Sequence, residues 1–155
     1  QDLRDTVVVA ADVGEAKDAG RFAKRLGLPL AIVDKRRVDD REQAKAFYLV
    51  GDVRGKRCLV VDDEIATGGT LFEAAELLRQ HGAVDVRAAI VHPVLSGEAV
   101  PRLDRSAVSQ LLVTDSLPLP TAKQSPRIEV LSVAPLIAAA IGRIHECQSV
   151  SELLQ

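Results

Sequence analysis

The chain has 155 residues, of which 47% are hydrophobic and 27% charged, with a formal net charge of -2. This length suits one ordinary domain with a sizeable core, and the charge argues against a general nucleic-acid binder, which would be basic. No apolar run is long enough to span a membrane, and aromatic residues, at 3%, are too few for base-stacking platforms.

The start of the chain and its two cysteines indicate what kind of protein it belongs to. The chain contains no methionine and begins with Gln1, so we expect it to be part of a longer protein or one whose start is missing. No signal peptide is apparent, and the composition favours a cytoplasmic protein. Cys58 and Cys147 are therefore predicted to be reduced, buried thiols rather than a disulfide or a metal site.

Short apolar runs alternate along the chain with segments of helical periodicity. Strands are predicted at 6–11, 30–33, 47–50, 59–61, 86–91, 110–114 and 127–131, and helices at 15–26, 70–80, 98–104 and 133–146. In the first helix Phe22 and Leu26 belong to the apolar stripe, and Gly27 is placed to end it. The alternation predicts a single doubly wound α/β domain over residues 1–155, with a mainly parallel sheet flanked by helices.

One segment breaks the alternation. Residues 34–42 read Asp-Lys-Arg-Arg-Val-Asp-Asp-Arg-Glu, with charges packed together and no apolar periodicity. We expect this segment to be an exposed, mobile loop.

A small-residue turn between a strand and a helix is the strongest local signal. The apolar run 59–61 predicts a buried parallel strand. Gly68 and Gly69 allow positive φ angles, so that backbone N–H groups can cradle a phosphate where the next helix begins. Thr67 and Thr70 add hydroxyl donors.

Two carboxylates, Asp62 and Asp63, stand directly before that turn. They would repel a phosphate, but they suit neutral hydroxyl groups or a divalent cation, both of which accompany a sugar phosphate. The alternative is an ordinary strand–helix turn in which Thr70 caps the helix. The acids favour a phosphosugar site.

Candidate functional residues follow predicted strands, as expected for ligands bound beyond the carboxyl ends of a doubly wound sheet. They are Asp12, Lys35, 62–70, His92 and 114–116. No GxxxxGK[ST] sequence is present, which excludes a nucleotide kinase built on that loop.

The segment VVDDEIATGGT is similar to the phosphoribosyl-pyrophosphate (PRPP) loop shared by phosphoribosyltransferases and ribose-phosphate pyrophosphokinases. Further segments that keep order and spacing narrow the resemblance to the pyrophosphokinases: VVVAADVGEAKDAGRFAKRLGLPLAIVDKRR, GDVRGKRCLVVDDEIATGGTL, HPVLSGEAV, LLVTDSLPLP and RIHECQSVSELL. The chain resembles the C-terminal half of such an enzyme, with a fold like that of type I phosphoribosyltransferases.

The resemblance implies transfer of the pyrophosphoryl group of ATP to the anomeric hydroxyl of ribose 5-phosphate, giving PRPP and AMP. It implies Mg²⁺ as cofactor and a homo-oligomer, a dimer building a hexamer. Adenine would be recognised largely by the N-terminal half and a neighbouring subunit. The chain alone is therefore expected to be incomplete.

The resemblance also implies roles for individual residues. Ribose 5-phosphate would be bound by Asp62, Asp63, Ala66, Thr67, Gly68, Gly69 and Thr70. Lys35 and Arg37 would act in catalysis, Asp12 would lie near the metal, and Ser149, Val150 and Ser151 would form part of an allosteric site. His92 and His145 are expected to be structural.

The sequence departs from the family pattern at several positions, and two alternatives to a pyrophosphokinase remain to be considered. Glu15 stands where a glycine is common, and Ala66 stands where many members carry an aspartate. A proline often follows the Lys-Arg-Arg run in the family, and Val38 replaces it here. A non-catalytic regulatory paralogue would have little reason to keep Lys35 and Arg37. A phosphoribosyltransferase, which consumes PRPP, does not need the basic segment or the HPVLSG and QSVSELL segments.

Overall fold

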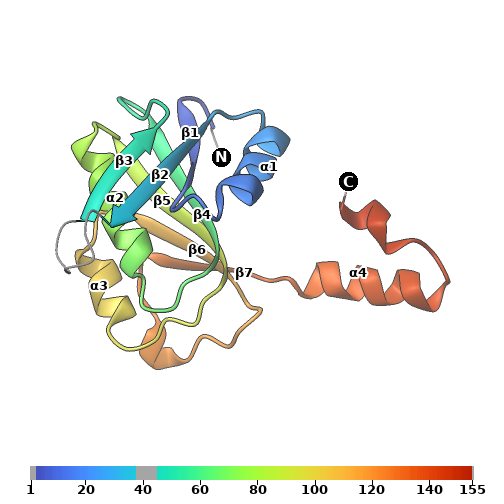
Figure 1. Ribbon diagram of the computed structural model, residues 1–155. Helices are drawn as coiled ribbons and strands as arrows, with labels where there is room; N and C mark the ends of the chain where they lie inside the picture. Colours follow the sequence, from blue (N-terminus) through green and yellow to red (C-terminus); the bar gives the residue numbers. More distant parts are fainter. Residues whose placement is uncertain (1–2, 38–44, 155) are drawn as a thin grey trace.

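The computed structural model describes residues 3–37 and 45–154 (Figure 1). Its elements, in chain order, are β1 (Thr6–Ala10), α1 (Ala16–Leu26), β2 (Leu30–Arg37), β3 (Lys45–Val50), β4 (Arg57–Glu64), α2 (Gly69–Gln80), β5 (Asp85–His92), α3 (Ala99–Arg105), β6 (Gln110–Thr114), the short 3-10 helix η1 (Thr121–Lys123), β7 (Ile128–Leu131), α4 (Ala134–His145) and the 3-10 helix η2 (Val150–Leu154). All the strands and helices expected from the sequence are present, most of them with shifted ends.

The strands form one sheet in the order β3-β2-β1-β4-β5-β6-β7. All neighbouring pairs are parallel except β2 and β3, which are antiparallel. The chain moves from β1 outward to β2 on one side and resumes with β4 on the other side of β1. This reversal places a crevice beyond the carboxyl ends of β1 and β4, where ligands bind in open α/β sheets.

One face of the sheet carries the main core. Alternate strand residues such as Val60, Ala88 and Leu111 point to this face and are at most 1% exposed. They pack against the buried sides of α2 and α3, which contribute Leu78 and Leu103 among others. Two helices thus cover this face, and α2 begins shortly after the end of β4.

The opposite face is only partly covered by the described residues. Helix α1 packs Ala19 and Ala23 over Val8 and Ala10 of β1. Phe22 and Leu26 belong to the same apolar stripe, but each of these residues is 38% exposed.

The charged segment is structured differently from what its composition predicted. Residues 34–37 were expected in a mobile loop, but they continue β2 as far as Arg37. Each of them pairs across the sheet with β3, for example Lys35 with Phe47. Backbone pairing with an antiparallel neighbour supplies the hydrogen bonds that the local sequence does not predict. Residues 38–42 of the expected loop lie outside the described residues.

Helix α4 extends away from the sheet in Figure 1 and contributes no buried residue. Its apolar residues Leu136, Ile137, Ile141 and Ile144 are between 49% and 65% exposed. At its start the Val133 N–H donates to Asp115 Oδ1 at 2.7 Å, which ties the beginning of the helix to the residue after β6. Among the described residues no helix is long and apolar enough to cross a bilayer.

The two cysteines differ in environment. Both are free, but Cys58 on β4 is buried and Cys147 after α4 is exposed. The expectation that both are buried is therefore wrong for Cys147, because the helix that precedes it extends away from the sheet and contains no buried residue.

Candidate active site

The register of the central strands brings the predicted acids to one edge of the sheet. Ala10, the last residue of β1, lies beside Val61 of β4. Asp12 follows shortly after the first, and Asp62 directly after the second. Asp12 and Asp62, fifty positions apart in the sequence, therefore lie at the same edge of the sheet, in the crevice where the strand order reverses.

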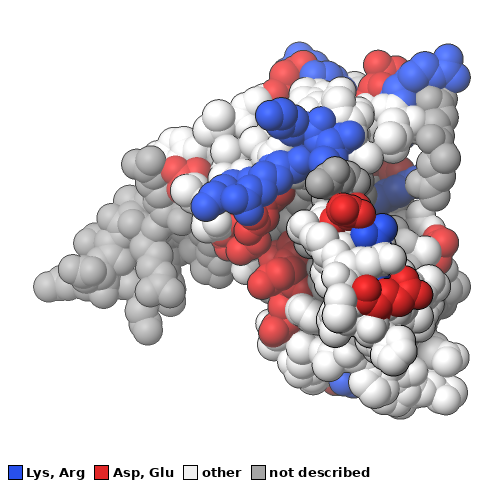
Figure 2. Space-filling model, turned by 90° about the vertical axis from the view of Figure 1, so that its right-hand side faces the viewer, with Lys and Arg blue, Asp and Glu red and all other residues white. Residues whose placement is uncertain are grey.

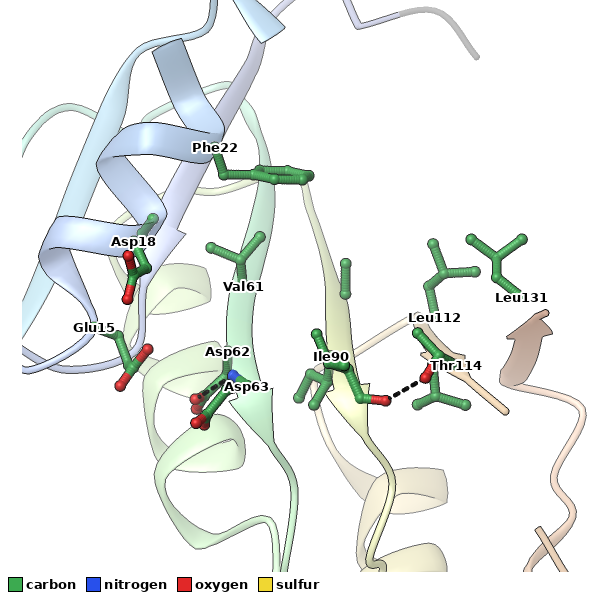
Figure 3. A pocket seen from close by; sticks show the side chains of 14 residues that line it. Glu15, Asp18, Phe22, Val61, Asp62, Asp63, Ile90, Leu112, Thr114 and Leu131 are labelled. Carbon is green, nitrogen blue, oxygen red and sulfur yellow. Dashed lines mark hydrogen bonds between the residues drawn. The ribbon is translucent and has the colours of Figure 1, made fainter. Parts of the chain in front are cut away.

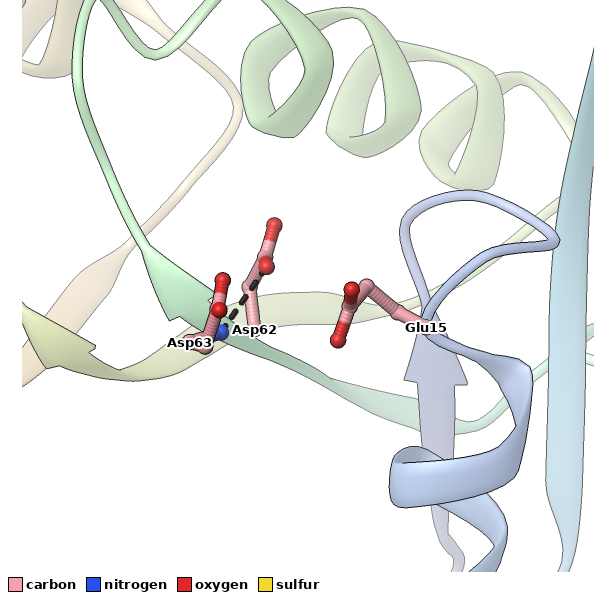
Figure 4. A group of neighbouring side chains, drawn as sticks. All are labelled: Glu15, Asp62 and Asp63. Carbon is pink, nitrogen blue, oxygen red and sulfur yellow. Dashed lines mark hydrogen bonds between the residues drawn. The ribbon is translucent and has the colours of Figure 1, made fainter.

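A third carboxylate joins the pair. Glu15, in the loop before α1, points toward Asp62 and Asp63 across the crevice (Figure 4). Each of the three offers an oxygen atom, and these atoms lie within 4.8 Å of one another. Sequence reasoning noted Glu15 only as a departure from the family pattern. Its place just after β1, the strand next to β4, is the signal that could have identified it.

The proximity and burial of these acids perturb their proton affinity. Burial, helped by the nearby Glu15 and Asp63, raises the pKa of Asp62 to about 6, although the Asp63 N–H donates to Asp62 Oδ1 at 2.8 Å. Burial also raises the pKa of Glu15, and the charges of Asp63 and Asp12 add to the effect. The crevice therefore favours a partner that supplies positive charge or hydroxyl donors.

Asp12 has a separate local contact. Its Oδ1 accepts the Glu15 N–H at 3.2 Å, as expected of an aspartate that stabilises the turn into α1. Asp12 is not among the three clustered carboxylates, but it lies close enough to Glu15 to affect its pKa. The sequence-predicted metal residue thus borders the acidic group.

The small-residue loop follows β4 and opens α2. Gly68 is left-handed, with φ 73° and ψ 9°, and is the residue before the first helical residue, Gly69. No side chain caps α2, so the alternative in which Thr70 serves as a helix cap is not supported. A helix N-terminus carries partial positive charge and N–H groups without intrahelical partners, which together attract anions.

An open hollow of about 560 Å³ lies beside the acidic group, between α1 and the uncovered face of the sheet (Figure 3). Its polar end is formed by Glu15, Asp62 and Asp63, and its floor is apolar, with Val61 on one side and Leu112 on the other. Figure 2, turned from the view of Figure 1, shows acidic side chains gathered in a strip beside long basic ones on this side of the molecule.

The backbone of β2 carries Lys35 and Arg37 beyond the same edge. Ile32 lies beside Ala10 of β1. Since β2 continues in the same direction, the backbone of Lys35 lies about 10 Å further along, at roughly 3.3 Å per residue. The two basic positions are therefore on the side of the sheet where the acids and the glycine loop lie.

Of two other groups predicted from the sequence, one borders the hollow through Thr114 and the other lies away from it. His92 Nδ1 is 2.9 Å from Ser116 Oγ, and Thr114 Oγ1 donates to the Val91 carbonyl at 2.7 Å, so these residues tie the ends of β5 and β6 together. Ser149 to Ser151 lie beyond α4, far from the crevice in Figure 1. There the Ser149 carbonyl accepts a hydrogen bond from Arg143 at 2.9 Å.

A mainly parallel sheet with two carboxylates and a glycine loop at its switch point defines a protein of the phosphoribosyltransferase fold. Orotate phosphoribosyltransferase from Aeropyrum pernix shares this fold, with a TM-score of 0.56 at 24% identity over 90% of this chain and 66% of that one. The chain belongs to the family described as the phosphoribosyl synthetase-associated domain, whose model matches residues 40–155.

Two further relatives make the resemblance more specific. The ribose-phosphate pyrophosphokinase of Caldanaerobacter subterraneus subsp. tengcongensis is 50% identical over 149 residues, which cover 96% of this chain and 47% of that protein. The crystal structure of phosphoribosylpyrophosphate synthetase from Mycobacterium smegmatis matches with a TM-score of 0.84 at 42% identity, covering 92% of this chain and 45% of that one. The fold class and the resemblance to pyrophosphokinases are confirmed. The chain spans about half the length of these relatives.

Proposed function

We propose that this chain supplies the ribose 5-phosphate site and the basic catalytic segment of a ribose-phosphate pyrophosphokinase. The reaction transfers the pyrophosphoryl group of ATP to the anomeric hydroxyl of ribose 5-phosphate and releases AMP. The observation that carries the proposal is the junction of β4 and α2, where two carboxylates precede a left-handed glycine at the start of a helix.

This junction suits the two ends of a sugar phosphate. The N–H groups at the start of α2 and the hydroxyls of Thr67 and Thr70 would hold the 5-phosphate, with Ala66, Gly68 and Gly69 contributing backbone. Asp62 and Asp63 would accept hydrogen bonds from the ribose 2- and 3-hydroxyls. The acids also keep the phosphate at the loop, because like charges repel it from the crevice.

Lys35 and Arg37 would stabilise the charge on the transferred group. Phosphoryl-type transfer depends mainly on positioning and on positive charge around the reacting centre. The backbone of β2 brings both residues to the edge where the sugar would be held. A cationic side chain there could meet the phosphates of ATP.

The carboxylates fit the proposed Mg²⁺, since hard cations prefer oxygen ligands. Asp12, Glu15, Asp62 and Asp63 are the residues that could hold it directly or through water. When bound, the ion would neutralise charge on the pyrophosphoryl group. The protein's own part is to keep these oxygens at one end of the crevice.

The remaining parts of the proposal concern the whole protein. We infer a cytoplasmic enzyme in which this chain is the C-terminal half, works with an N-terminal half and assembles as a homo-oligomer, a dimer building a hexamer. Ser149, Val150 and Ser151 would contribute to an allosteric site. The names of relatives at 45–50% identity support a pyrophosphokinase over a phosphoribosyltransferase.

A titration tests the sugar site directly. The 155-residue chain should bind ribose 5-phosphate by calorimetry, and Asp63→Asn should weaken binding about tenfold, since hydrogen bonds to a charged group contribute about 1.5–3 kcal/mol. Ribose without phosphate serves as the control ligand. A folded chain that binds no ribose 5-phosphate at millimolar concentration would contradict the proposal.

A chimera tests catalysis. This chain replaces the matched part of the Caldanaerobacter pyrophosphokinase, and AMP formation from ATP and ribose 5-phosphate is measured. Lys35→Ala should lower kcat about a hundredfold, whereas Lys17→Ala, an exposed lysine on α1, should leave it unchanged. Rates within a few-fold of each other for these variants would exclude the role of Lys35. No AMP from a folded chimera would favour a regulatory paralogue.

A further inference from the structure

The loop between β4 and α2 is held from one side by the segment that follows β5. The Leu95 N–H donates to the Ile65 carbonyl at 2.9 Å, and the Ser96 N–H donates to the Ala66 carbonyl at 3.0 Å. The next carbonyl, that of Thr67, accepts a hydrogen bond from the Arg102 guanidinium at 3.1 Å. Three consecutive carbonyls therefore point toward residues 95–102.

This arrangement fixes where the N–H groups of the loop point. In a trans peptide the N–H is directed opposite to the preceding C=O, and the described residues contain no cis peptide. The N–H groups of Ala66, Thr67 and Gly68 must therefore face away from residues 95–102. No hydrogen bond found within the described part of the chain has one of these three N–H groups as its donor. They form one wall of the proposed phosphate site.

The third hydrogen bond differs from the other two because a side chain makes it. Arg102, on α3, also lies over the ring of Phe72, with its guanidinium carbon 5.1 Å from the ring centroid. The same ring fills the space behind Gly68, since a Cβ at that glycine would stand 2.3 Å from Phe72 Cε2. Guanidinium, ring and glycine thus form a stack that supports the turn into α2.

We infer that Arg102 is a positioning residue for the phosphate loop. It holds the Thr67 carbonyl and the Phe72 ring, and so keeps the Gly68 N–H turned toward the phosphate. This inference rests on the proposed function for the identity of the ligand. Arg102 is exposed, so neither burial nor core packing accounts for its contacts.

Replacing Arg102 by lysine distinguishes an effect of its charge alone from an effect on the position of the loop. Lysine keeps the charge but lacks the planar fork that donates to a carbonyl while stacking on a ring. If Arg102 only attracted the anion, Arg102→Lys would bind ribose 5-phosphate like the wild type. If it positions the loop, Arg102→Lys should recover only part of what Arg102→Gln loses.

The experiment compares Arg102→Gln, Arg102→Lys and the matched control Arg105→Gln in the 155-residue chain. Arg105 lies on the same helix and donates to the Pro101 carbonyl at 3.1 Å. Affinity for ribose 5-phosphate should fall about tenfold in Arg102→Gln and about threefold in Arg102→Lys, and by less than twofold in Arg105→Gln, as expected for one hydrogen bond with its orienting effect.

A second readout needs no ligand. The ¹⁵N order parameters of Gly68 and Gly69 should fall from the rigid value of about 0.85 toward about 0.6 in Arg102→Gln, while Arg105→Gln leaves them unchanged. Unchanged order parameters in Arg102→Gln would overturn the inference. So would equal affinities in the three variants. If the folded wild type binds no ribose 5-phosphate, the proposed function fails, and the order parameters still decide the role of Arg102.

Discussion

Replacing Gly68 by alanine should destabilise the protein through two separable effects. The first is the backbone, because φ 73° is left-handed and costs a residue with a Cβ roughly 1–2 kcal/mol. The second is steric, since the new Cβ would stand 2.3 Å from Phe72 Cε2 and 2.5 Å from Cζ. The ring is largely buried at 8% exposure, so moving it adds about 1–3 kcal/mol of overpacking.

Gly55→Ala is the matched control for the backbone effect. Gly55 has φ 71°, nearly the angle of Gly68, and a Cβ there would meet nothing within 4 Å. Urea denaturation should give a loss of unfolding free energy of about 1–2 kcal/mol for Gly55→Ala and about 2–5 kcal/mol for Gly68→Ala. In a Phe72→Leu background the Gly68 loss should approach that of Gly55.

Equal losses for the two glycine variants would refute the reasoning, because they would leave only the backbone effect. An unchanged Gly68 loss in the Phe72→Leu background would do the same for the part assigned to the ring. Either result would also mean that the Phe72 ring does not support Gly68, and so would count against the proposed role of Arg102.

Three further experiments, two with variants and one with a thiol reagent, test other parts of the structure. The pKa of Asp62 in the folded chain is about 6, raised from the ordinary 3.8. Ionisation of Asp62 therefore lowers the stability of the folded state as pH rises from 3.8 to 6. Asp62→Asn should stabilise the chain by about 1–2 kcal/mol above pH 6, allowing for solvent screening, and this gain should be absent below pH 4. A gain independent of pH in urea melts would contradict this. Iodoacetamide should modify exposed Cys147 and not Cys58, whose pKa burial raises to about 12; mass spectrometry showing native Cys58 modified first would refute it. Gly142→Ala, with nothing near its added Cβ, should increase helicity by circular dichroism, since glycine costs a helix about 0.5–1 kcal/mol; unchanged or lower helicity would count against it.

The glycine loop was predictable because its signals are local. An apolar strand, two acids and paired glycines follow one another within a dozen residues, and the structure keeps that order in β4, the loop and α2. The fold class was predictable for a related reason, since alternating strands and helices leave few ways to build a parallel sheet. The family resemblance rests on the same contiguous segments.

The failures of prediction share a non-local cause. Residues 34–37 form a strand because β3 pairs with them, and no pattern within the segment reports its neighbour. Cys147 is exposed because α4 leaves the sheet, although its alanine-rich sequence predicted only that it is a helix.

By itself, the sequence determined the elements, their alternation and the phosphate-type loop, since backbone propensity and hydrophobic period act over a few residues. Only the tertiary structure decided which distant side chains share the crevice. The register of β1 against β4 brings Glu15 to Asp62 and Asp63, and the packing of α3 brings Arg102 to the Thr67 carbonyl. These contacts join residues more than thirty positions apart, and their geometry follows from sheet pairing and core packing, which operate on the whole chain.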